Sequence, residues 1–343
     1  MDIKRCPFLQ FVLLSALLSV ISATVCPAES LISPFCSCYQ KSNNLPDLIC
    51  ENFENSDQLK NVFNQSFPNN DFNSIILEFS NLPSLPADAF NEKTFKRINI
   101  ERTNIKSIHR YAFRGSKDTL QVLAAIGNEK LESFPLDGLW GFEKLEAIIF
   151  SVMSIDTIRS LPSLPSLKKI AVQQLPNMKV LTQFPYLPNL ATLRVIDTGV
   201  ETIESRILEN LPSLRKFEFD ENNIKVMKKG FFEFHSKIEE ISFEGNGIEE
   251  VEEGSITGTD SIILASFKDN KLRTIDEKAF RNMIENIGKN SGKIIFQGNP
   301  LECFCAVKWL ISDASLKSAL YEAKCAGKTD LDTLPESFLD QIC

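Results

Sequence analysis

The sequence is poor in the residues from which most catalytic and metal sites are built. It has two histidines in 343 residues, His109 and His235, which lie far apart in the chain. It contains no G-x-S-x-G motif, no phosphate-binding P-loop and no cluster with metal-ligand spacing. Carboxylate pairs are plentiful, but a pair alone defines no chemistry. We therefore expect no enzyme activity, no catalytic residue, no bound metal and no cofactor.

Excess positive charge is also missing. The formal net charge is -8 and the pI is about 5.1, which argues against nucleic acid or an anionic membrane as a partner. The apolar run from Phe8 to Ile21 is shorter than the ~20 residues of a membrane-spanning helix. It follows two basic residues and ends in small ones, which predicts a secretory signal peptide over residues 1–23. An uncleaved signal anchor is the alternative. No hydrophobic tail follows Cys343, so we expect no membrane span or lipid anchor there.

Cysteine is absent from about 250 residues in the middle of the chain. Loss of the signal peptide removes Cys6 and leaves four cysteines near each end. They are Cys26, Cys36, Cys38 and Cys50 in the first set, and Cys303, Cys305, Cys325 and Cys343 in the second. An even count in a secreted chain predicts disulfides, with three possible pairings per set. Zinc is the competing interpretation for four cysteines.

Phenylalanine, in contrast, occurs 26 times, and the cysteine-free middle is a repeat. Each copy reads apolar-x-apolar, then Asn or a substitute three residues on, then two further apolar residues. Ten copies begin at Ile75, Ile98, Leu123, Ile148, Ile170, Leu193, Phe217, Ile241, Ala265 and Ile294. The apolar-x-apolar pair predicts a short strand, and copies too small to fold alone must stack and share one core. Fifteen residues after the start lies a predicted interior column, with Phe90, Phe113, Phe232 and Phe280.

The Asn position turns the chain, because its side-chain amide can bond backbone groups that a buried turn leaves unpaired. Met153 and Leu175 occupy this position in the fourth and fifth copies and cannot form these bonds. Either these copies bend locally, or an insertion between Val172 and Leu181 places Asn177 in the turn.

This pattern resembles the leucine-rich repeat, and the C-x-C segments with Trp309 resemble the Cys-rich flanks of extracellular members. The resemblance implies disulfides Cys26–Cys38, Cys36–Cys50, Cys303–Cys325 and Cys305–Cys343. The expected fold is an α/β-type solenoid: a curved horseshoe of about ten repeats, with parallel strands on the concave face and a disulfide cap at each end. The expected segments are a signal peptide at 1–23, a cap at 24–60, repeats at 61–298 and a cap at 299–343.

At subfamily level the plan is similar to arthropod secreted leucine-rich repeat proteins of the kind that includes the non-catalytic subunit of a shrimp luciferase. That resemblance implies a binding or stabilising role beside a partner. The alternatives are a secreted binding protein, an adhesion or receptor ectodomain, an auxiliary subunit of a separate enzyme, and an enzyme inhibitor.

The concave strand face is the expected binding surface, because inward and exposed residues alternate along a strand. We expect a protein partner to dock there. The predicted contact residues are Ile126, Ile149, Val152 and Ile196 in the middle of the array, and Glu218, Asp220 and Glu244 toward its C-terminal end. The alternative is that twist and loops bury the aliphatic residues. Before the first repeat, Asn64-Gln65-Ser66 is a glycosylation sequon, in keeping with a secreted, extracellular protein.

Overall fold

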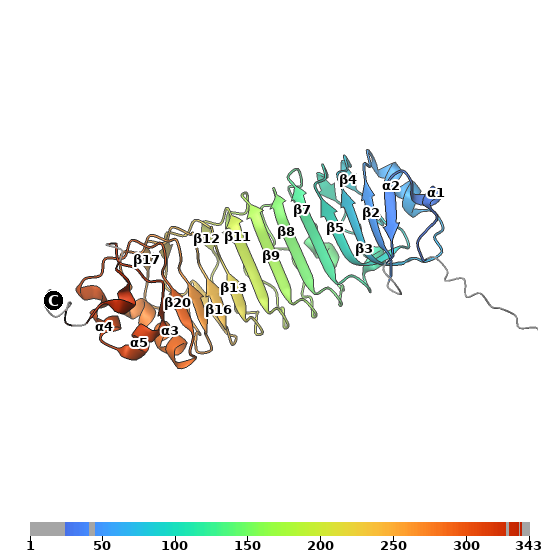
Figure 1. Ribbon diagram of the computed structural model, residues 1–343. Helices are drawn as coiled ribbons and strands as arrows, with labels where there is room; N and C mark the ends of the chain where they lie inside the picture. Colours follow the sequence, from blue (N-terminus) through green and yellow to red (C-terminus); the bar gives the residue numbers. More distant parts are fainter. Residues whose placement is uncertain (1–24, 41–44, 327–328, 336, 338–343) are drawn as a thin grey trace, which may run out of the picture.

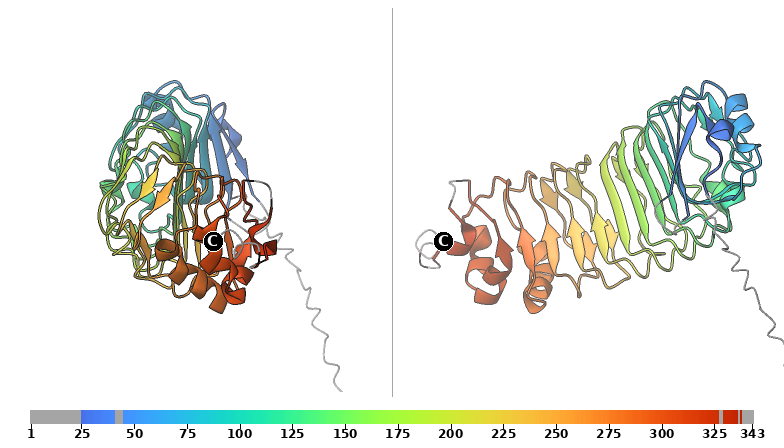
Figure 2. Two further views of the ribbon diagram at one scale, coloured as in Figure 1. Left: turned by 90° about the vertical axis from the view of Figure 1, so that its left-hand side faces the viewer. Right: turned by 45° about the vertical axis from the view of Figure 1, so that its right-hand side comes forward.

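The computed structural model is an elongated array of stacked turns (Figure 1). It describes residues 25–40, 45–326, 329–335 and 337. Thirteen strands of this described part form one sheet that runs the whole length of the array. The first pair, β1 and β2, is antiparallel, and every later pair is parallel. Seen nearly end-on, the turns enclose a single interior (Figure 2).

The sheet strands follow the chain in order from the N-terminal end. They are β1 (Cys36–Tyr39), β2 (Asp47–Glu51), β3 (Asp71–Glu78), β5 (Thr94–Glu101), β7 (Val122–Asn128), β8 (Ala147–Met153), β9 (Lys169–Leu175), β11 (Thr192–Thr198), β13 (Lys216–Glu218), β16 (Glu240–Ser242), β19 (Leu264–Ser266), β20 (Lys293–Ile295) and β21 (Leu320–Tyr321). All ten predicted repeat starts lie in one row of register partners. Leu48 of β2 and Leu320 of β21 extend that row at its two ends. The parallel sheet is therefore two strands longer than the ten repeats, and it crosses both predicted cap boundaries.

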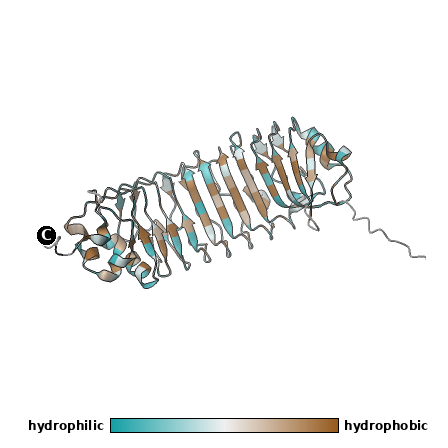
Figure 3. Ribbon diagram, in the orientation of Figure 1, coloured by the Kyte–Doolittle hydropathy of each residue, from teal (hydrophilic) through white to brown (hydrophobic). Residues whose placement is uncertain are grey.

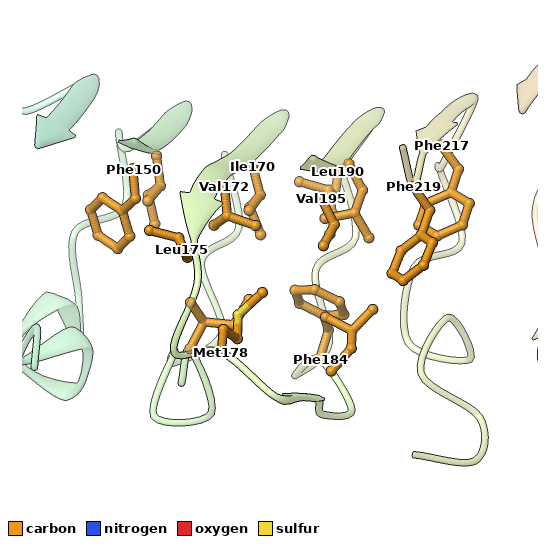
Figure 4. Packing of buried hydrophobic residues seen from close by; sticks show 14 of the residues in the cluster. Phe150, Ile170, Val172, Leu175, Met178, Phe184, Leu190, Val195, Phe217 and Phe219 are labelled. Atoms are coloured by element: carbon orange, nitrogen blue, oxygen red, sulfur yellow. The ribbon is translucent and has the colours of Figure 1, made fainter. Parts of the chain in front are cut away.

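Alternate strand residues point into the interior and form one continuous core. In β8, for example, Ile148 and Phe150 are buried while Ile149 between them is partly exposed. Figure 4 shows inward side chains of successive strands meeting Met178 and Phe184, which come from the opposite side of the turn. The predicted phenylalanine column is confirmed, since all four members are at most 4% exposed. The stack thus removes from water apolar area that a single repeat could not cover.

Buried amides hold the turn that follows each strand in much of the array. The Nδ2 of Asn246 donates to the Phe219 carbonyl at 2.7 Å, and its Oδ1 accepts from the backbone N–H of Asn222 at 3.1 Å. Asn270 repeats the bond one turn later, donating to the Phe243 carbonyl. Each amide therefore satisfies backbone groups of the preceding repeat, which water cannot reach.

We call the Asn position of each repeat, from Ser80 to Asn299, the ladder position. The residue before it adopts the left-handed backbone conformation, with a positive φ, in all ten copies. These residues are Phe79, Arg102, Gly127, Val152, Gln174, Asp197, Glu221, Gly245, Asp269 and Gly298. Glycine adopts this conformation without steric cost, whereas a β-branched side chain does not. Val152, with φ of 55°, is therefore the most strained of these ten left-handed residues, which we call the left-handed column.

Met153 and Leu175 do occupy the ladder position, so the register alternative with Asn177 was wrong. Met153 pairs with Asn128 and Leu175 with Thr198, with no insertion between them. Both side chains are buried, and they fill the space with apolar volume in place of an amide. Asn177 lies at the surface and donates to the Ser154 carbonyl at 3.0 Å, which ties the two turns together from outside.

Short strands and helices complete the other sides of the turns. Four two-stranded parallel ladders pair β4 (Ser84–Leu85) with β6 (Ser107–Ile108), β10 (Val180–Leu181) with β12 (Thr202–Ile203), β14 (Val226–Met227) with β17 (Glu250–Val251), and β15 (Phe232–Glu233) with β18 (Ile256–Thr257), within the described residues. The α-helices are α1 (Glu29–Ile32), α2 (Ser56–Phe63), α3 (Glu277–Lys289), α4 (Lys308–Ile311) and α5 (Ala314–Ala319). The 3₁₀ helices are η1 (Arg114–Ser116), η2 (Leu136–Leu139), η3 (Cys305–Val307) and η4 (Leu331–Thr333). Helix is thus concentrated at the two ends (Figure 1).

Disulfides close both ends of the core. The structure joins Cys26 to Cys38, Cys36 to Cys50, and Cys303 to Cys325, which are pairs that the family resemblance implies. Cys305 is also disulfide-bonded, and Cys343, its expected partner, lies outside the described residues. The described cysteines are joined in disulfides, so their sulfur atoms are not available as zinc ligands.

Trp309 attaches the C-terminal cap to the last helix-bearing repeat. Its indole Nε1 donates to the Ile275 carbonyl at 3.3 Å, and the Arg281 guanidinium lies 5.0 Å from its ring centroid. The side chain is partly buried and packs against the hydrophobic core.

Replacing Asn246 by Ala should lower the free energy of unfolding by about 2–4 kcal/mol, because two buried backbone groups lose their partners. Urea unfolding followed by circular dichroism measures the change. Asn177→Ala is the matched control, since its amide is exposed, and it should cost less than about 1 kcal/mol. Equal losses in the two variants would contradict the role assigned to the buried ladder.

Candidate binding face

The outward face of the sheet changes character along the array. Strands β7 and β8 carry apolar residues at nearly every position, so both are brown for most of their length in Figure 3. Strand β5 before them carries Lys96, Arg97 and Glu101 on exposed or partly exposed positions. Strand β13 after them begins an acidic segment with Glu218. The middle of the face is therefore an apolar area between two charged ones.

Three of the predicted aliphatic residues lie on the outward face of these middle strands. Ile149 of β8 is flanked in register by Ala124 of β7 and Ala171 of β9. Ile126 and Ile196 share the next row, in register with Ser151 and Gln173 between them. At about 4.8 Å per strand, Ile126 and Ile196 are roughly 14 Å apart.

The aliphatic side chains of this area are partly exposed, so the alternative that twist and loops bury them is not realised. Ile126, Ile149, Val152 and Ile196 all have intermediate exposure. Ala124 also occupies an outward strand position, but it is only 3% exposed. Its methyl group is short, and the larger Asn99 and Ile149 stand in register on either side of it. We call Ile126, Ile149, Val152 and Ile196 the apolar patch.

Val152 lies at the edge of the sheet rather than on its flat face. It lines a groove of about 420 Å³ together with Ser154, Gln174, Pro176 and Asp197. The groove runs beside the turns in which Met153 and Leu175 replace the ladder amide. The apolar patch therefore continues over the strand ends into a hollow that a partner's side chain can enter.

The predicted acidic residues come together in a second, smaller hollow of about 190 Å³. Glu218, Asp220 and Glu244 all line it, with Lys216 on its rim. Glu218 is paired with Arg194 and, at 3.0 Å, with Lys216, and the Ser266 hydroxyl donates to Glu244 at 2.7 Å. Most of this charge is thus neutralised or hydrogen-bonded within the chain. Hydrogen bonds to Glu240 and Glu218 hold the pKa of Lys216 above its usual range.

Burial raises the pKa of Asp220 to about 6. Its carboxylate accepts the backbone N–H of Glu244 at 2.8 Å, and a hydrogen bond with Ser242 also favours the charged form. Desolvation outweighs both bonds, and the nearby charges of Glu244 and Glu218 add to the rise. The acidic hollow therefore changes its charge in mildly acidic solution.

Metal binding and membrane crossing both depend on features that would be visible in the described residues. No group of three or more His, Cys, Asp or Glu side chains there is placed to hold a metal ion. In the same part of the chain, no helix is long and apolar enough to cross a membrane. The strand face offers a partner apolar contact area in its middle and charged side chains at its borders.

Sequence reasoning missed the left-handed column and the edge groove. The signal for the column was present in the Gly-Asn pairs at Gly127, Gly245 and Gly298, each directly before a ladder residue. The groove had no such signal, because its lining residues come from turns of four successive repeats.

The fold, the repeat register and the capped ends define a leucine-rich repeat protein with a disulfide cap at each end. The chain belongs to the family described as the BspA type leucine-rich repeat region, whose model matches residues 37–159 and 166–287 in six copies. It is also homologous to the Oplophorus-luciferin 2-monooxygenase non-catalytic subunit of Oplophorus gracilirostris. The two are 27% identical over 326 residues, which cover 94% of this chain and 89% of that protein.

A solved structure has the same fold. A chain of the octameric complex of Latrophilin 3, Unc5D and the leucine-rich repeat segment of FLRT2 superposes with a TM-score of 0.61. The alignment covers 90% of this chain and 99% of that one, at 14% sequence identity. At that identity the likeness describes the architecture alone.

Asp220→Asn should stabilise the protein at pH 7.5 and have little effect near pH 4. A carboxyl whose pKa is higher in the folded chain stabilises the fold below the unfolded value of 3.8, and that contribution is lost as the pH rises through 6. The gain at pH 7.5 should be roughly 2 kcal/mol, because Asp220 is only partly buried.

Urea unfolding of both proteins at pH 4, 6 and 7.5 measures the effect. Asp269→Asn is the control, since its carboxylate is exposed. A difference between Asp220→Asn and the parent chain that does not vary with pH would refute the raised pKa.

Proposed function

We propose that this protein is a secreted, non-catalytic scaffold that binds a protein partner on the exposed sheet face over β7 to β11. The observation that carries the proposal is the apolar patch. Exposed aliphatic residues gathered on one face are typical of an interface. Here they lie on neighbouring strands between charged borders, with Ser151 and Gln173 between Ile126 and Ile196. The contact set includes Ile126, Ile149, Val152 and Ile196, with Glu218, Asp220 and Glu244 at its C-terminal border.

The shape of the face supports a macromolecular partner over a small ligand. The aliphatic residues lie in neighbouring rows of one sheet, and the patch deepens only at the edge groove beside Val152. A flat apolar area with one hollow favours a partner that lays a surface on the strands and inserts a side chain at the edge. The acidic border beyond Arg194 would orient a partner that carries basic residues.

An auxiliary subunit of a separate secreted enzyme is the second candidate function. It is favoured by the homologous protein, whose name describes a non-catalytic subunit of a monooxygenase. In that case the apolar patch would contact and stabilise a catalytic chain, and this chain would carry no reacting group. The partner's identity distinguishes an auxiliary enzyme subunit from a scaffold for adhesion. Partners can be captured from the fluid into which the protein is secreted and identified by mass spectrometry. An enzyme among the partners favours the auxiliary subunit, and a receptor or matrix protein favours adhesion.

Once a partner is purified, the double variant Ile149→Asp/Ile196→Asp should weaken its binding at least a hundredfold while the fold is retained. Two charges at the centre of an apolar interface would be buried without counterions, which costs several kcal/mol. Surface plasmon resonance measures binding, and circular dichroism with thermal unfolding monitors the fold.

Val180→Asp is the matched control, because this valine is 38% exposed on the β10 side of the array, away from the strand face. It should bind like the parent chain. Undiminished binding by the double variant would retire the strand face as the partner site.

Export and glycosylation form part of the proposal. The disulfides at both ends are stable in an oxidising compartment, which supports secretion. The signal peptide expected over residues 1–23 lies outside the described residues. Asn64 ends helix α2, and both it and Ser66 are exposed, so the sequon is accessible to a glycan.

Secretion from insect or mammalian cells should yield a chain whose mobility in gel electrophoresis rises after treatment with peptide N-glycosidase. Asn64→Gln should migrate at the deglycosylated position without treatment, because it removes the acceptor amide. Asn61→Gln is the control, as it alters an exposed amide of the same helix that lies outside the sequon. An untreated parent chain that co-migrates with Asn64→Gln would show that the sequon is not used.

A further inference from the structure

A hollow of about 270 Å³ lies on the flank of the array, away from the sheet, between the second and third repeats. It is lined by Arg110, Tyr111, Arg114, Lys117, Asp137, Gly138, Trp140 and Phe142. These residues come from the segments that follow β6 and surround η2, so the flank hollow shares no residue with the apolar patch.

Two glycines of the segment Leu136–Phe142 make this hollow possible. A Cβ at Gly138 would stand 2.1 Å from the Arg110 carbonyl oxygen, so a side chain there would push the two repeats apart. Gly141 has a φ of 80°, and a Cβ there would meet the Lys117 side chain at 2.6 Å. Glycine at both positions lets Lys117 and the η2 segment lie close together, with Trp140 directed outward.

One wall of the flank hollow is a tyrosine between two guanidinium groups. Arg110 and Arg114 lie 5.3 and 5.6 Å from the Tyr111 ring centroid. Each is also paired with a carboxylate: Arg110 with Asp137 at 3.2 Å, and Arg114 with Asp88 through two bonds of 3.0 and 2.6 Å. Stacking and ion pairs together fix both arginines and largely neutralise them.

The other wall pairs an available cation with an exposed aromatic ring. Lys117 Nζ lies 5.2 Å from the Trp140 centroid, and within the described part of the chain no carboxylate forms an ion pair with it. Trp140 is 74% exposed and Tyr111 44% exposed, so both rings face solvent at the same hollow. Three cations and one carboxylate line this hollow, in a chain whose net charge is -8.

We propose that the flank hollow is a second interaction site, which binds an acidic segment of a protein partner. A carboxylate of the segment would meet Lys117, and an apolar or aromatic side chain beside it would pack on Trp140. Trp, Tyr and Arg are the residues most enriched at the energetic centres of protein interfaces. A sulfated polysaccharide fits less well, because it needs several available cations in a row and two of the three here already have carboxylate partners.

Peptide selection on the intact protein tests this site. The secreted full-length chain is immobilised and panned with a random dodecapeptide phage library, with counter-selection on the Lys117→Ala/Trp140→Ala double variant. Enriched peptides should combine Asp or Glu with an aromatic or long aliphatic residue. Measured by fluorescence anisotropy, their affinity should fall at least tenfold for Trp140→Ala and for Lys117→Ala. Raising the salt concentration should reduce the effect of Lys117→Ala, because it screens the charge contact.

Two matched variants and one competitor complete the experiment. Tyr186→Ala removes another exposed aromatic ring and Lys271→Ala another exposed cation, both in distant repeats, and neither should change peptide affinity. The Ile149→Asp/Ile196→Asp variant should bind the peptides normally, so this result is independent of the proposed strand-face function. Enriched peptides without acidic residues, or with equal affinity for Trp140→Ala, would overturn the proposal. So would binding at these residues by a heparin hexasaccharide but by no peptide.

Discussion

The hydrogen bonds of the buried turn are the constraint on which this molecule depends. Each repeat closes its coil by bending the chain inside the core, where backbone N–H and C=O groups lose access to water. A buried amide at the end of the strand satisfies them, as Asn246 does for Phe219 and Asn222. Wherever the ladder residue is Asn, its amide serves the backbone of the repeat before it, so these repeats are not complete alone. The stack must therefore be continuous, and its ends must be closed by the disulfide caps.

The same constraint requires a left-handed residue just before the ladder position in all ten copies. Where that residue is glycine, as at Gly245, the conformation is free of steric cost. Where it is Val152, the chain accepts strain and gains an apolar side chain at the rim of the edge groove. Strain of this kind persists only where the surroundings hold it. Here the buried Met153 packs next to it and fixes the turn from inside.

The two proposed binding sites lie on surfaces that one continuous core holds in place. The proposed strand-face and flank sites lie on different sides of the array, so two partners bound there would be held at a fixed spacing. On the strand face the aliphatic residues lie in the middle of the array, around the copies with the apolar ladder residues Met153 and Leu175, and the acidic residues lie toward its C-terminal end. Reacting groups are not needed for either surface, which accords with the name of the homologous non-catalytic subunit.

The sequence by itself determined the repeat, the register of all copies except the fourth and fifth, and the capped ends. The period of apolar residues recurs locally, and each repeat start, from Ile75 to Ile294, has the same inward position because strand side chains alternate. The amide-free copies were visible too, but whether Asn177 or Leu175 took the turn depended on pairing with the next strand, which only the folded stack decides. Tertiary structure likewise decided that Ala124 is covered and Ile149 is not, since exposure depends on the size of neighbours in adjacent strands. The flank hollow was beyond reach of the sequence, because Lys117 and Trp140 meet only when two repeats stack and Gly141 leaves room between them.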